Sequence, residues 1–426
     1  MTDPNENRPG YKKTKVGWIP EGWKPSPLAS MRSYLGSGIS RPFFDDPSQG
    51  IPVLRSNNVQ DGHVVTTDLK YWHDPDPRGA DLETAKPHPG DILINFVNGS
   101  RKELGKAGVY EGDPTGCIVS TNFFIFRPDR TIARSDYLAY HFCGDCYHRW
   151  LHRTVGFSGP GSFNQQQIAS HTIPLPPLPE QQKIADILST WDDAIEQTRD
   201  LIQAKKKQKK AIMQQLLTGK RRLPGFAGEW EANQLSSLVT RIKETADDPS
   251  QYFVLSITAG TGFVSQADKF SRVIAGKHIE NYILLRRGEF SYNKGNSYRY
   301  PQGCVYQLHE YDEGLVPSVF YSFRVKPKKI HDAFLKHCFI AGLHNPQLYR
   351  WINTGVRNNG LLNLNASDFF NIALPLPKLP EQRAIAAVLD TADSEIQSLT
   401  DQLTALQQQK KGLMQRLLTG QVRVKV

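Results

Sequence analysis

One segment of this chain occurs twice, and the two copies align without a gap. Residues 174–219 and 375–420 are separated by a constant offset of 201 residues, and about 24 of the 46 aligned positions are identical. Agreement at this level is far above chance for unrelated segments, so the chain contains an internal duplication. Any fold for this chain must therefore provide two equivalent places for the segment.

Each copy carries the signals that begin a long helix. Pro179 and Pro380 are predicted in the first helical turn, because the fixed φ of proline suits this position and its missing N–H would have no partner there. Glu180 and Glu381 follow directly, where the positive end of the helix dipole favours an anion. No further proline interrupts either copy. Each copy is therefore predicted as one helix of roughly 38 residues, or about 57 Å.

Both copies end on Leu-Leu-Thr-Gly, with Gly219 and Gly420 placed to adopt the left-handed conformation that caps helices. Between these ends, apolar side chains recur with a seven-residue period. The seam comprises Leu188, Trp191, Ile195, Ile202, Ile212 and Leu216 in the first copy, and Leu389, Ile396, Leu399, Leu403, Leu406 and Leu413 in the second. An exposed apolar stripe is unstable in water, so the simplest arrangement pairs the helices as an intramolecular coiled coil. Two separate amphipathic core helices are the alternative, which the matching lengths and caps disfavour.

The regions that precede the two copies are rich in short strand-like runs bounded by turn residues. In the first, strands are predicted at 51–55, 63–67, 91–95, 108–110, 118–120 and 122–127, and short helices at 135–142 and 165–169. The second repeats this order with strands at 252–256, 288–293 and 318–324 and a helix at 333–339. A chain of 426 residues is too long for one core. We predict an α+β protein with two similar mixed α/β domains, at 1–174 and 223–374, each followed by a long helix, at 175–222 and 375–426.

Composition narrows the functional class. The net charge is +10 and the pI is near 9.2, which favours a polyanionic partner, although the lysines at 205–210 are also typical of a solvated helix face. Five scattered cysteines indicate reduced thiols. Cys143 and Cys146 have the spacing of half a zinc site, but nothing completes it, so no metal is predicted. No apolar run is long enough to cross a membrane and no signal peptide is evident, so a cytoplasmic protein is predicted.

Motifs of catalysis are missing from the sequence. Residues 99–107 resemble a phosphate-binding loop, but five residues separate the glycines where four are required. Ala107 also stands where a Ser or Thr would bind Mg²⁺. We find no methyltransferase, serine-hydrolase or zinc-protease motif. The sequence therefore predicts no catalytic residues and no cofactor.

Loop clusters that mix amides with basic side chains are the candidates for contact with DNA, because such groups read base edges and bind phosphates. In the first half these are Arg55, Asn57, Asn58, Asn98, Ser100, Arg101, Lys102, Lys106, Ser162 and Asn164, and in the second Lys294, Asn296, Tyr298, Arg299, Arg357, Asn358 and Asn359. The clusters of the second half occupy the positions of first-half clusters along the repeat, which favours the set as a DNA-binding surface. A solvated surface loop is the alternative for any single residue.

The doubled motif resembles that of a known family. Leu-Pro-Glu-Gln followed by a long helix ending Leu-Leu-Thr-Gly, twice in one chain, is similar to the DNA-specificity subunit of type I restriction-modification systems. The resemblance extends to Trp-Ile-Pro-Glu-Gly-Trp at 18–23, Pro-Val-Leu-Arg-Ser-Asn-Asn at 52–58 and Gly-Asp-Ile-Leu at 90–93. At the corresponding place in the second half stands Leu-Ser-Ile-Thr-Ala at 255–259, so the roles of Arg55 to Asn58 do not transfer there.

This resemblance implies two target-recognition domains that each read half of a split double-stranded DNA site. It also implies that the two long helices, conserved in the family, form an antiparallel coiled coil with pseudo-two-fold symmetry and dock two methyltransferase subunits. A translocating restriction subunit completes such complexes, and the specificity subunit is not itself catalytic. Three alternatives stay open: a protein-binding scaffold, the specificity subunit of a methylation-only defence system, and an enzyme in its own right.

Overall fold

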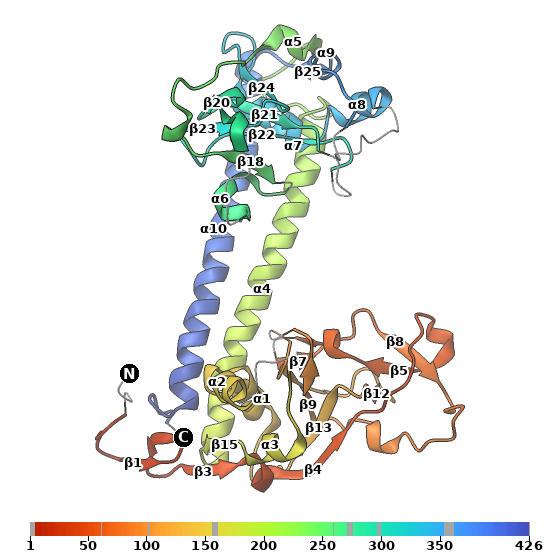
Figure 1. Ribbon diagram of the computed structural model, residues 1–426, viewed down its shortest axis with the longest axis vertical. Coiled ribbons are helices and arrows are strands. Elements are labelled where there is room, and N and C mark those ends of the chain that lie inside the picture. The colour runs from red at the N-terminus through yellow and green to blue at the C-terminus, as the bar shows by residue number, and fades with distance from the viewer. Residues whose placement is uncertain are drawn as a thin grey trace. The chain divides into compact units, whose positions relative to one another are not determined.

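The structure, a computed structural model, describes residues 5–60, 62–100, 103–155, 161–258, 260–270, 276–295, 300–352 and 362–425. The chain groups into two compact units: unit 1 comprises residues 1–199 and 402–426, and unit 2 comprises residues 200–401. Each unit thus combines a globular part with portions of both long helices (Figure 1). The division of the chain into four segments at 174, 222 and 374 stays a prediction, because each compact unit includes both globular and helical segments.

The two long helices begin and end close to the predicted residues. Helix α4 spans Leu178–Leu216 and helix α10 spans Leu379–Leu418, so each starts one residue before its predicted proline. Gly219 and Gly420 have φ values of 70° and 69°, which confirms the predicted left-handed caps. No helix in the described part of the chain combines the length and the apolar character that a membrane crossing requires.

Within each unit, the portions of α4 and α10 run antiparallel. In unit 2, Lys205 pairs with Glu395 at 2.6 Å and Lys209 pairs with Asp393, so the residue number falls on one helix as it rises on the other. In unit 1, Asp192 pairs with Lys410, and Glu180 pairs with Arg423 just beyond the end of α10. The order is again reversed. The antiparallel pairing that the family resemblance implied is therefore confirmed inside each unit.

The predicted seam faces inward along these helix portions. Leu188, Ile195, Ile202, Leu216 and Leu389 are buried, and Trp191, Ile212, Ile396, Leu399, Leu403, Leu406 and Leu413 are half-buried. None of these seam residues is fully exposed, as expected for side chains at a helix–helix contact. Their assignment to the docking of other subunits stays a prediction.

The globular part of unit 1 is built mainly from β-strands. The strands are β1 (Tyr11–Thr14), β2 (Gly17–Pro20), β3 (Lys24–Pro27), β4 (Arg32–Ser37), β5 (Gly50–Leu54), β6 (Val59–Gln60), β7 (Gly62–Val64), β8 (Lys70–His73), β9 (Ile92–Asn95), β10 (Val97–Asn98), β11 (Ala107–Val109), β12 (Ile118–Val119), β13 (Phe123–Pro128), β14 (Gly161–Ser162) and β15 (Thr172–Leu175). The shorter helices are α1 (Ser135–Cys143), α2 (Asp145–Thr154) and α3 (Gln165–Ser170). All strands and helices predicted for this half are present, with shifts of a few residues at their ends.

The main sheet of unit 1 has the order β4-β13-β9-β11-β7-β6, and β12-β5-β8 form a second sheet. Strand β13 lies between β4 and β9, antiparallel to both, with Phe126 opposite Ile92. The core beneath this sheet joins it to the long helices: buried Phe126 and Tyr137 share one apolar cluster with Leu188 of α4 and Leu417 of α10.

Unit 2 repeats part of this plan. Its strands are β16 (Glu231–Gln234), β17 (Val239–Arg241), β18 (Leu255–Thr258), β19 (Gly262–Ser265), β20 (Ile283–Arg286), β21 (Phe290–Asn293), β22 (Cys304–Gln307), β23 (Glu313–Val316), β24 (Tyr321–Val325) and β25 (Ala373–Leu376). Its shorter helices are α5 (Leu235–Leu238), α6 (Gln266–Phe270), α7 (Asp332–Ile340), α8 (Asn345–Trp351) and α9 (Ala366–Phe370). The main sheet, β17-β24-β21-β22, packs its phenylalanines against α7 and Leu389 of α10.

The start of each long helix is fixed to its own globular part in the same way. The Gln181 side chain accepts the Arg134 N–H at 2.9 Å before α1, and that of Gln382 accepts the His331 N–H at 2.8 Å before α7. Both glutamines are almost fully buried. These bonds use the otherwise free backbone donors at the start of α1 and α7, so the duplicated sequence fixes the position of both helices.

Candidate nucleic-acid interface

The turn after β5 presents two of the predicted DNA-binding residues. Arg55 precedes the 3-10 turn η3 (Ser56–Asn58), and its Nη2 lies 3.2 Å from an Asp68 carboxylate oxygen. The Asn57 amide donates to the same oxygen at 3.0 Å. Asp68 therefore holds Arg55 and Asn57 side by side. Nothing in the sequence pattern marked Asp68, which lies 13 residues from Arg55 along the chain.

Asn58 has a different role. Its side chain is fully buried, and its Nδ2 donates to the carbonyl oxygens of Val65 and Thr67 at 3.1 and 2.8 Å. Its Oδ1 accepts the Arg55 N–H at 3.0 Å. A buried amide whose bonds all go to the backbone cannot reach a base edge. We therefore remove Asn58 from the DNA-binding set, because its bonds form the turn that presents Asn57.

Asn57 and Lys106, predicted from separate loops, line one hollow of about 370 Å³. The other lining residues are Ser56, Val59, Gln60 and Glu103. Lys106 Nζ lies 2.7 Å from a Glu103 carboxylate oxygen, and each side chain is about one-third exposed. The hollow thus offers amide, carboxylate and ammonium groups together, the donors and acceptors that base edges require. Gln60 and Glu103 were not predicted, since each is a single polar residue outside the clusters.

A second group of predicted residues meets at a short ribbon. Strands β10 and β14 pair antiparallel, with Asn98 opposite Gly161 and Val97 opposite Ser162. The Asn98 side chain accepts the Ser100 N–H at 2.9 Å, which tightens the turn that follows. Asn98, Ser100 and Ser162 are thereby gathered at one edge of unit 1. Asn164 caps α3 instead, because its Oδ1 accepts the N–H of Gln167 at 2.8 Å.

Among the DNA-binding residues predicted in the second half, only Lys294 lies within the described residues. Lys294 follows β21, and its ammonium lies 5.1 Å from the centre of the Tyr321 ring, a cation–π contact. The remaining candidates lie outside the described residues, as do two from the first half. They are Arg101, Lys102, Asn296, Tyr298, Arg299, Arg357, Asn358 and Asn359.

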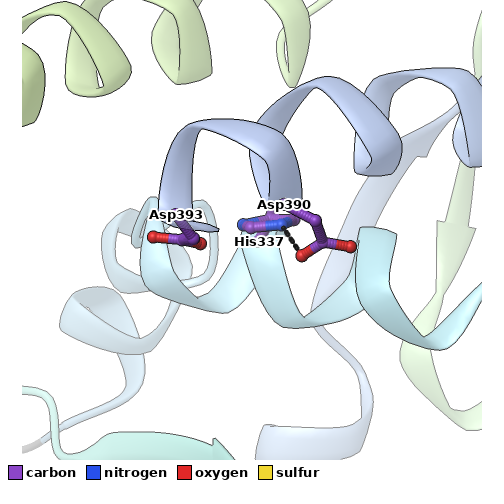
Figure 2. Close-up of side chains that lie close together, drawn as sticks. All are labelled: His337, Asp390 and Asp393. Atoms are coloured by element: carbon purple, nitrogen blue, oxygen red, sulfur yellow. Dashed lines mark hydrogen bonds and ion pairs between the residues drawn. The ribbon is translucent and has the colours of Figure 1, made fainter. Parts of the chain in front are cut away.

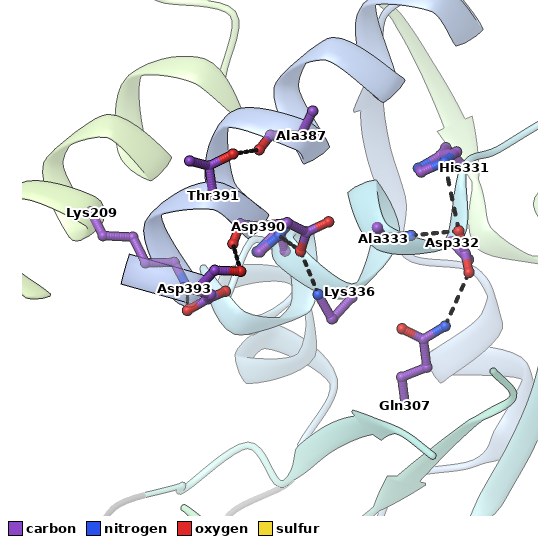
Figure 3. Close-up of polar contacts among 12 residues, drawn as sticks. Lys209, Gln307, His331, Asp332, Ala333, Lys336, Ala387, Asp390, Thr391 and Asp393 are labelled. Atoms are coloured by element: carbon purple, nitrogen blue, oxygen red, sulfur yellow. Dashed lines mark hydrogen bonds and ion pairs between the residues drawn. The ribbon is translucent and has the colours of Figure 1, made fainter. Parts of the chain in front are cut away.

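Unit 2 also contains a polar cluster where α7 packs on α10. His337 Nε2 lies 2.9 Å from an Asp390 oxygen (Figure 2), and the Lys336 ammonium lies 2.7 Å from the same oxygen (Figure 3). Asp393, one turn further along α10, pairs with Lys209 of α4 (Figure 3). Burial, together with the charge of Lys336, lowers the pKa of His337. Burial acts to raise the pKa of Asp390, but the bonds from Lys336 and His337 outweigh it and lower that pKa.

Among the described residues, His337, Asp390 and Asp393 are a group whose possible ligand atoms lie within 4.8 Å of one another. Both carboxylates already bind lysine ammonium groups, which a divalent cation would have to displace. The arrangement therefore fits an ion-pair network that fixes α7 to the long helices better than it fits a metal site. In the described part of the chain, Cys143 and Cys146 do not belong to any such group.

Unit 1 has a related junction with different residues. Asp192, which corresponds to Asp393 at the offset of 201, pairs with Lys410 and also accepts the Tyr140 hydroxyl at 2.8 Å. His141 does not bond to the helix as His337 does, because its Nε2 lies 3.0 Å from the Nε2 of His171. The two units thus fix their globular parts to the long helices through different side chains about one turn apart, at Asp192 in unit 1 and at Asp390, which corresponds to Ser189, in unit 2.

The comparisons with known proteins agree with this architecture. Residues 83–207 and 312–408 match the family described as the type I restriction modification DNA specificity domain. The two matched segments lie in the two halves of the chain and together make up more than half of it. The chain therefore belongs to the type I restriction-modification DNA specificity family, whose members recognise DNA.

Curated relatives cover nearly all of the chain. The putative type I restriction enzyme MjaX specificity subunit of Methanocaldococcus jannaschii is 27% identical over 442 residues, which cover 97% of both chains. The MjaVIII specificity subunit of the same organism is 28% identical over 96% of this chain and 94% of its own. The EcoKI specificity subunit of Escherichia coli is 28% identical over 43% of this chain and 39% of its own.

Solved structures confirm the α+β fold. The S subunit of a type I restriction-modification system from M. genitalium has a TM-score of 0.55 at 12% identity, with 98% of this chain and 99% of that chain covered. A chain from a structural study of complex assembly and conformational transition in the type I system has a TM-score of 0.54 at 17% identity, covering 95% and 99%. At these identities the likeness concerns the fold alone.

Proposed function

We propose that this chain is the non-catalytic specificity subunit of a type I restriction-modification complex and that it reads a two-part double-stranded DNA target. The observation that carries the proposal is a shared framework with different loops. Strand β9 lies inside the main sheet of unit 1 and β21 lies at the equivalent place in the main sheet of unit 2. Helix α1 follows β13 along the chain, and helix α7 follows β24 in the same way. In unit 1 a turn presents Arg55 and Asn57, whereas strand β18 occupies the corresponding place in unit 2. Two recognition domains that share a framework but differ in their loops suit a DNA target with two different halves.

The partners proposed are two methyltransferase subunits and a restriction subunit. Each unit presents an antiparallel pair of helix portions with an Asp–Lys pair at equivalent positions. Two equivalent surfaces suit two copies of one partner. The relatives named above are subunits of type I restriction enzymes, which supports a restriction subunit as the further partner. The cytoplasmic location stays a prediction.

Methylation mapping tests this function directly. The chain is produced in cells together with its methyltransferase, and the methylated bases of the genome are mapped by sequencing. We expect one split motif whose two halves are separated by unread bases. Exchange of residues 223–374 for the equivalent region of a relative is expected to change one half of this motif and leave the other unchanged.

Two outcomes would contradict the proposal. A change in both halves after this exchange would mean that the two parts do not read separately. A protein-binding scaffold predicts that no motif depends on this chain. It also predicts no DNA binding that weakens with salt, although such weakening is expected when lysine and arginine neutralise phosphates.

A further inference from the structure

A large hollow in unit 1 lies away from the residues predicted to contact DNA. It has a volume of about 870 Å³ and is enclosed by the β1–β2 hairpin, helix α2, the start of β15 and the end of α10. We call it the hairpin pocket. Its volume falls in the range of sites that accept a small ligand or an anchoring group of a partner. None of the described residues predicted to bind DNA lines it.

The rim of the hairpin pocket carries positive charge that no carboxylate of the described residues compensates. Lys15 of the hairpin and Arg149 and Arg153 of α2 line it and are exposed. Within the described residues, none of the three forms an ion pair, and Arg149 donates only to the Cys146 sulfur, at 3.2 Å. Asp145, an acidic residue of the lining, is 3.2 Å from the Lys411 ammonium. The described part of the pocket thus has three cations without an anionic partner and suits an anionic occupant.

The floor of the hairpin pocket is aromatic and uncharged. The Trp150 and His171 rings lie 4.2 Å apart between centres, with Trp18 also in the lining. His171 is 5% exposed, and its Nδ1 has no partner among the described residues. Burial lowers the pKa of His171 to about 4, so its imidazole is neutral at pH 7. Aromatic rings and arginines in a concave site are typical of the points that anchor one protein on another.

The corresponding place in unit 2 is built differently. Ile372 stands at the position of His171 in the repeat. Gln347 of α8 both donates to and accepts from the backbone of Ala373, each at 2.8 Å, so this side chain is fully used inside the fold. The floor formed by Trp150 and the buried imidazole of His171 is therefore a feature of unit 1, although the long helices are duplicated.

We propose that the hairpin pocket docks a segment of the methyltransferase partner in which acidic side chains flank an aromatic or apolar anchor. The proposal rests on the proposed function. Charge complementarity identifies the occupant as anionic, and the concave aromatic floor favours an inserted side chain over the phosphate backbone of a duplex. Because the lining belongs to unit 1, one of the two methyltransferase subunits is held by a contact that its twin does not make.

The test measures assembly of the full-length chain with its methyltransferase. The double variant Arg149→Glu, Arg153→Glu is compared with Arg149→Lys, Arg153→Lys, which keeps the charge. We expect the reversal to weaken binding of the first methyltransferase at least tenfold and to make that binding less sensitive to salt, while the lysine variant stays within a few-fold of the wild type. The double variant Lys328→Glu, Arg350→Glu, at two exposed positions of unit 2, is the control with the same change in net charge.

A second variant tests the pocket by its volume and leaves its charge unchanged. Ser170 is exposed in the lining, so Ser170→Trp is expected to fill the pocket and weaken assembly without changing the net charge. Unchanged affinity in both the charge-reversal and the Ser170→Trp variants, with unchanged melting temperatures, overturns the proposal. Normal assembly with weakened DNA binding also overturns it, since the pocket would then contact nucleic acid. A wild-type chain that binds no methyltransferase refutes the proposed function itself, and the docking proposal with it.

Discussion

Asp192 and Lys410 form an ion pair in unit 1, and the same pair recurs in unit 2 with the helices exchanged, as Asp393 and Lys209. The two pairs are related by the repeat offset of 201 residues in both members. Because this ion pair is duplicated with the repeat, the antiparallel register of each unit follows from the duplicated sequence.

Loss of the Asp192 carboxylate is expected to lower the free energy of unfolding more than loss of the equivalent Asp393 carboxylate. Asp192→Asn leaves Lys410, whose side chain is 16% exposed, without its anion and weakens the bond from Tyr140. We expect a loss of about 1–3 kcal/mol in the free energy of unfolding. Asp393→Asn should cost less, because Asp393 is 44% exposed. Denaturant unfolding measures both, and the exposed Asp193→Asn is the control. Equal losses in all three variants would contradict this prediction.

Asn57 and Asn58 are adjacent in sequence but are expected to respond oppositely. Asn58→Ala removes a fully buried amide that donates to the carbonyls of Val65 and Thr67 and accepts the Arg55 N–H, so we expect a loss of about 1–3 kcal/mol in stability. Asn57→Ala removes an exposed amide and should leave stability within about 0.5 kcal/mol of the wild type. It should instead relax the sequence preference in one half of the methylated motif. A motif unchanged by Asn57→Ala would remove this residue from the proposed DNA contacts.

The sequence predicted the helices well because their start and stop signals are local. Prolines, a glutamate and a terminal glycine placed α4 and α10 within a residue at their starts, and the heptad pattern identified side chains that are buried. The polar pairs within the helices were missed, yet a signal existed. Asp192 and Lys209 are each identical in the second copy, and the residues on either side of Asp192 differ between the copies. An acidic and a basic residue that are both identical in the two copies of a coiled-coil helix are candidates for an ion pair between the helices.

The loops were less predictable because their roles depend on residues distant in sequence. Whether an asparagine faces solvent or closes a turn depends on backbone groups up to nine residues away, as in Asn58 and Thr67. The pocket that combines Lys15 with Arg149 depends on contacts between the ends of unit 1. Composition marked candidate loops, but it did not separate the residues that shape a loop from those that the loop presents to solvent.

Gly412 in α10 and Gly420, two residues beyond its end, provide a matched pair of substitutions. A Cβ at Gly412 would meet no atom of the described residues within 4 Å, and the first copy has Ala211 at this position. Gly412→Ala should therefore stabilise the protein by about 0.5–1 kcal/mol, because alanine loses less conformational freedom in a helix. Gly420→Ala should destabilise it, since its φ is 69° and a Cβ would lie 2.5 Å from Pro20 Cδ. Thermal and denaturant unfolding should therefore shift in opposite directions for the two variants.

Stability is expected to fall in mild acid because of the paired histidines in unit 1. Burial lowers the pKa of His171 to about 4 and that of His141 well below its usual value. Both are then neutral in the fold but become charged in the unfolded chain below about pH 6.5, so acid favours unfolding. For His171 the loss at pH 5 is about 2 kcal/mol relative to pH 8. This loss of stability increases further as the pH falls towards 4.

Replacement of His171 by the residue of the other repeat isolates this effect. His171→Ile introduces the side chain that Ile372 has at the equivalent position. It removes one titrating group and also the charge that disfavours protonation of His141. The variant is expected to be less stable at pH 8, where it loses the bond between the two rings, and to have a shallower decline between pH 6.5 and 4.5. An identical slope in the two proteins, measured by unfolding at several pH values, would show that this pair does not control the acid response.

The length of the helices is expected to set the number of unread bases in the target. Insertion of seven residues after Ala204 in α4 and after Ala405 in α10 adds one heptad to each copy at equivalent positions. Because seven residues preserve the apolar seam, the pairing should persist while each helix lengthens by about 10.5 Å, close to three base pairs. The methylated motif should therefore keep both halves and gain about three unread bases. Insertion of four residues shifts the seam and should be less stable. A spacer unchanged by the seven-residue insertion, in a variant that still methylates, would mean that the helices do not set the distance.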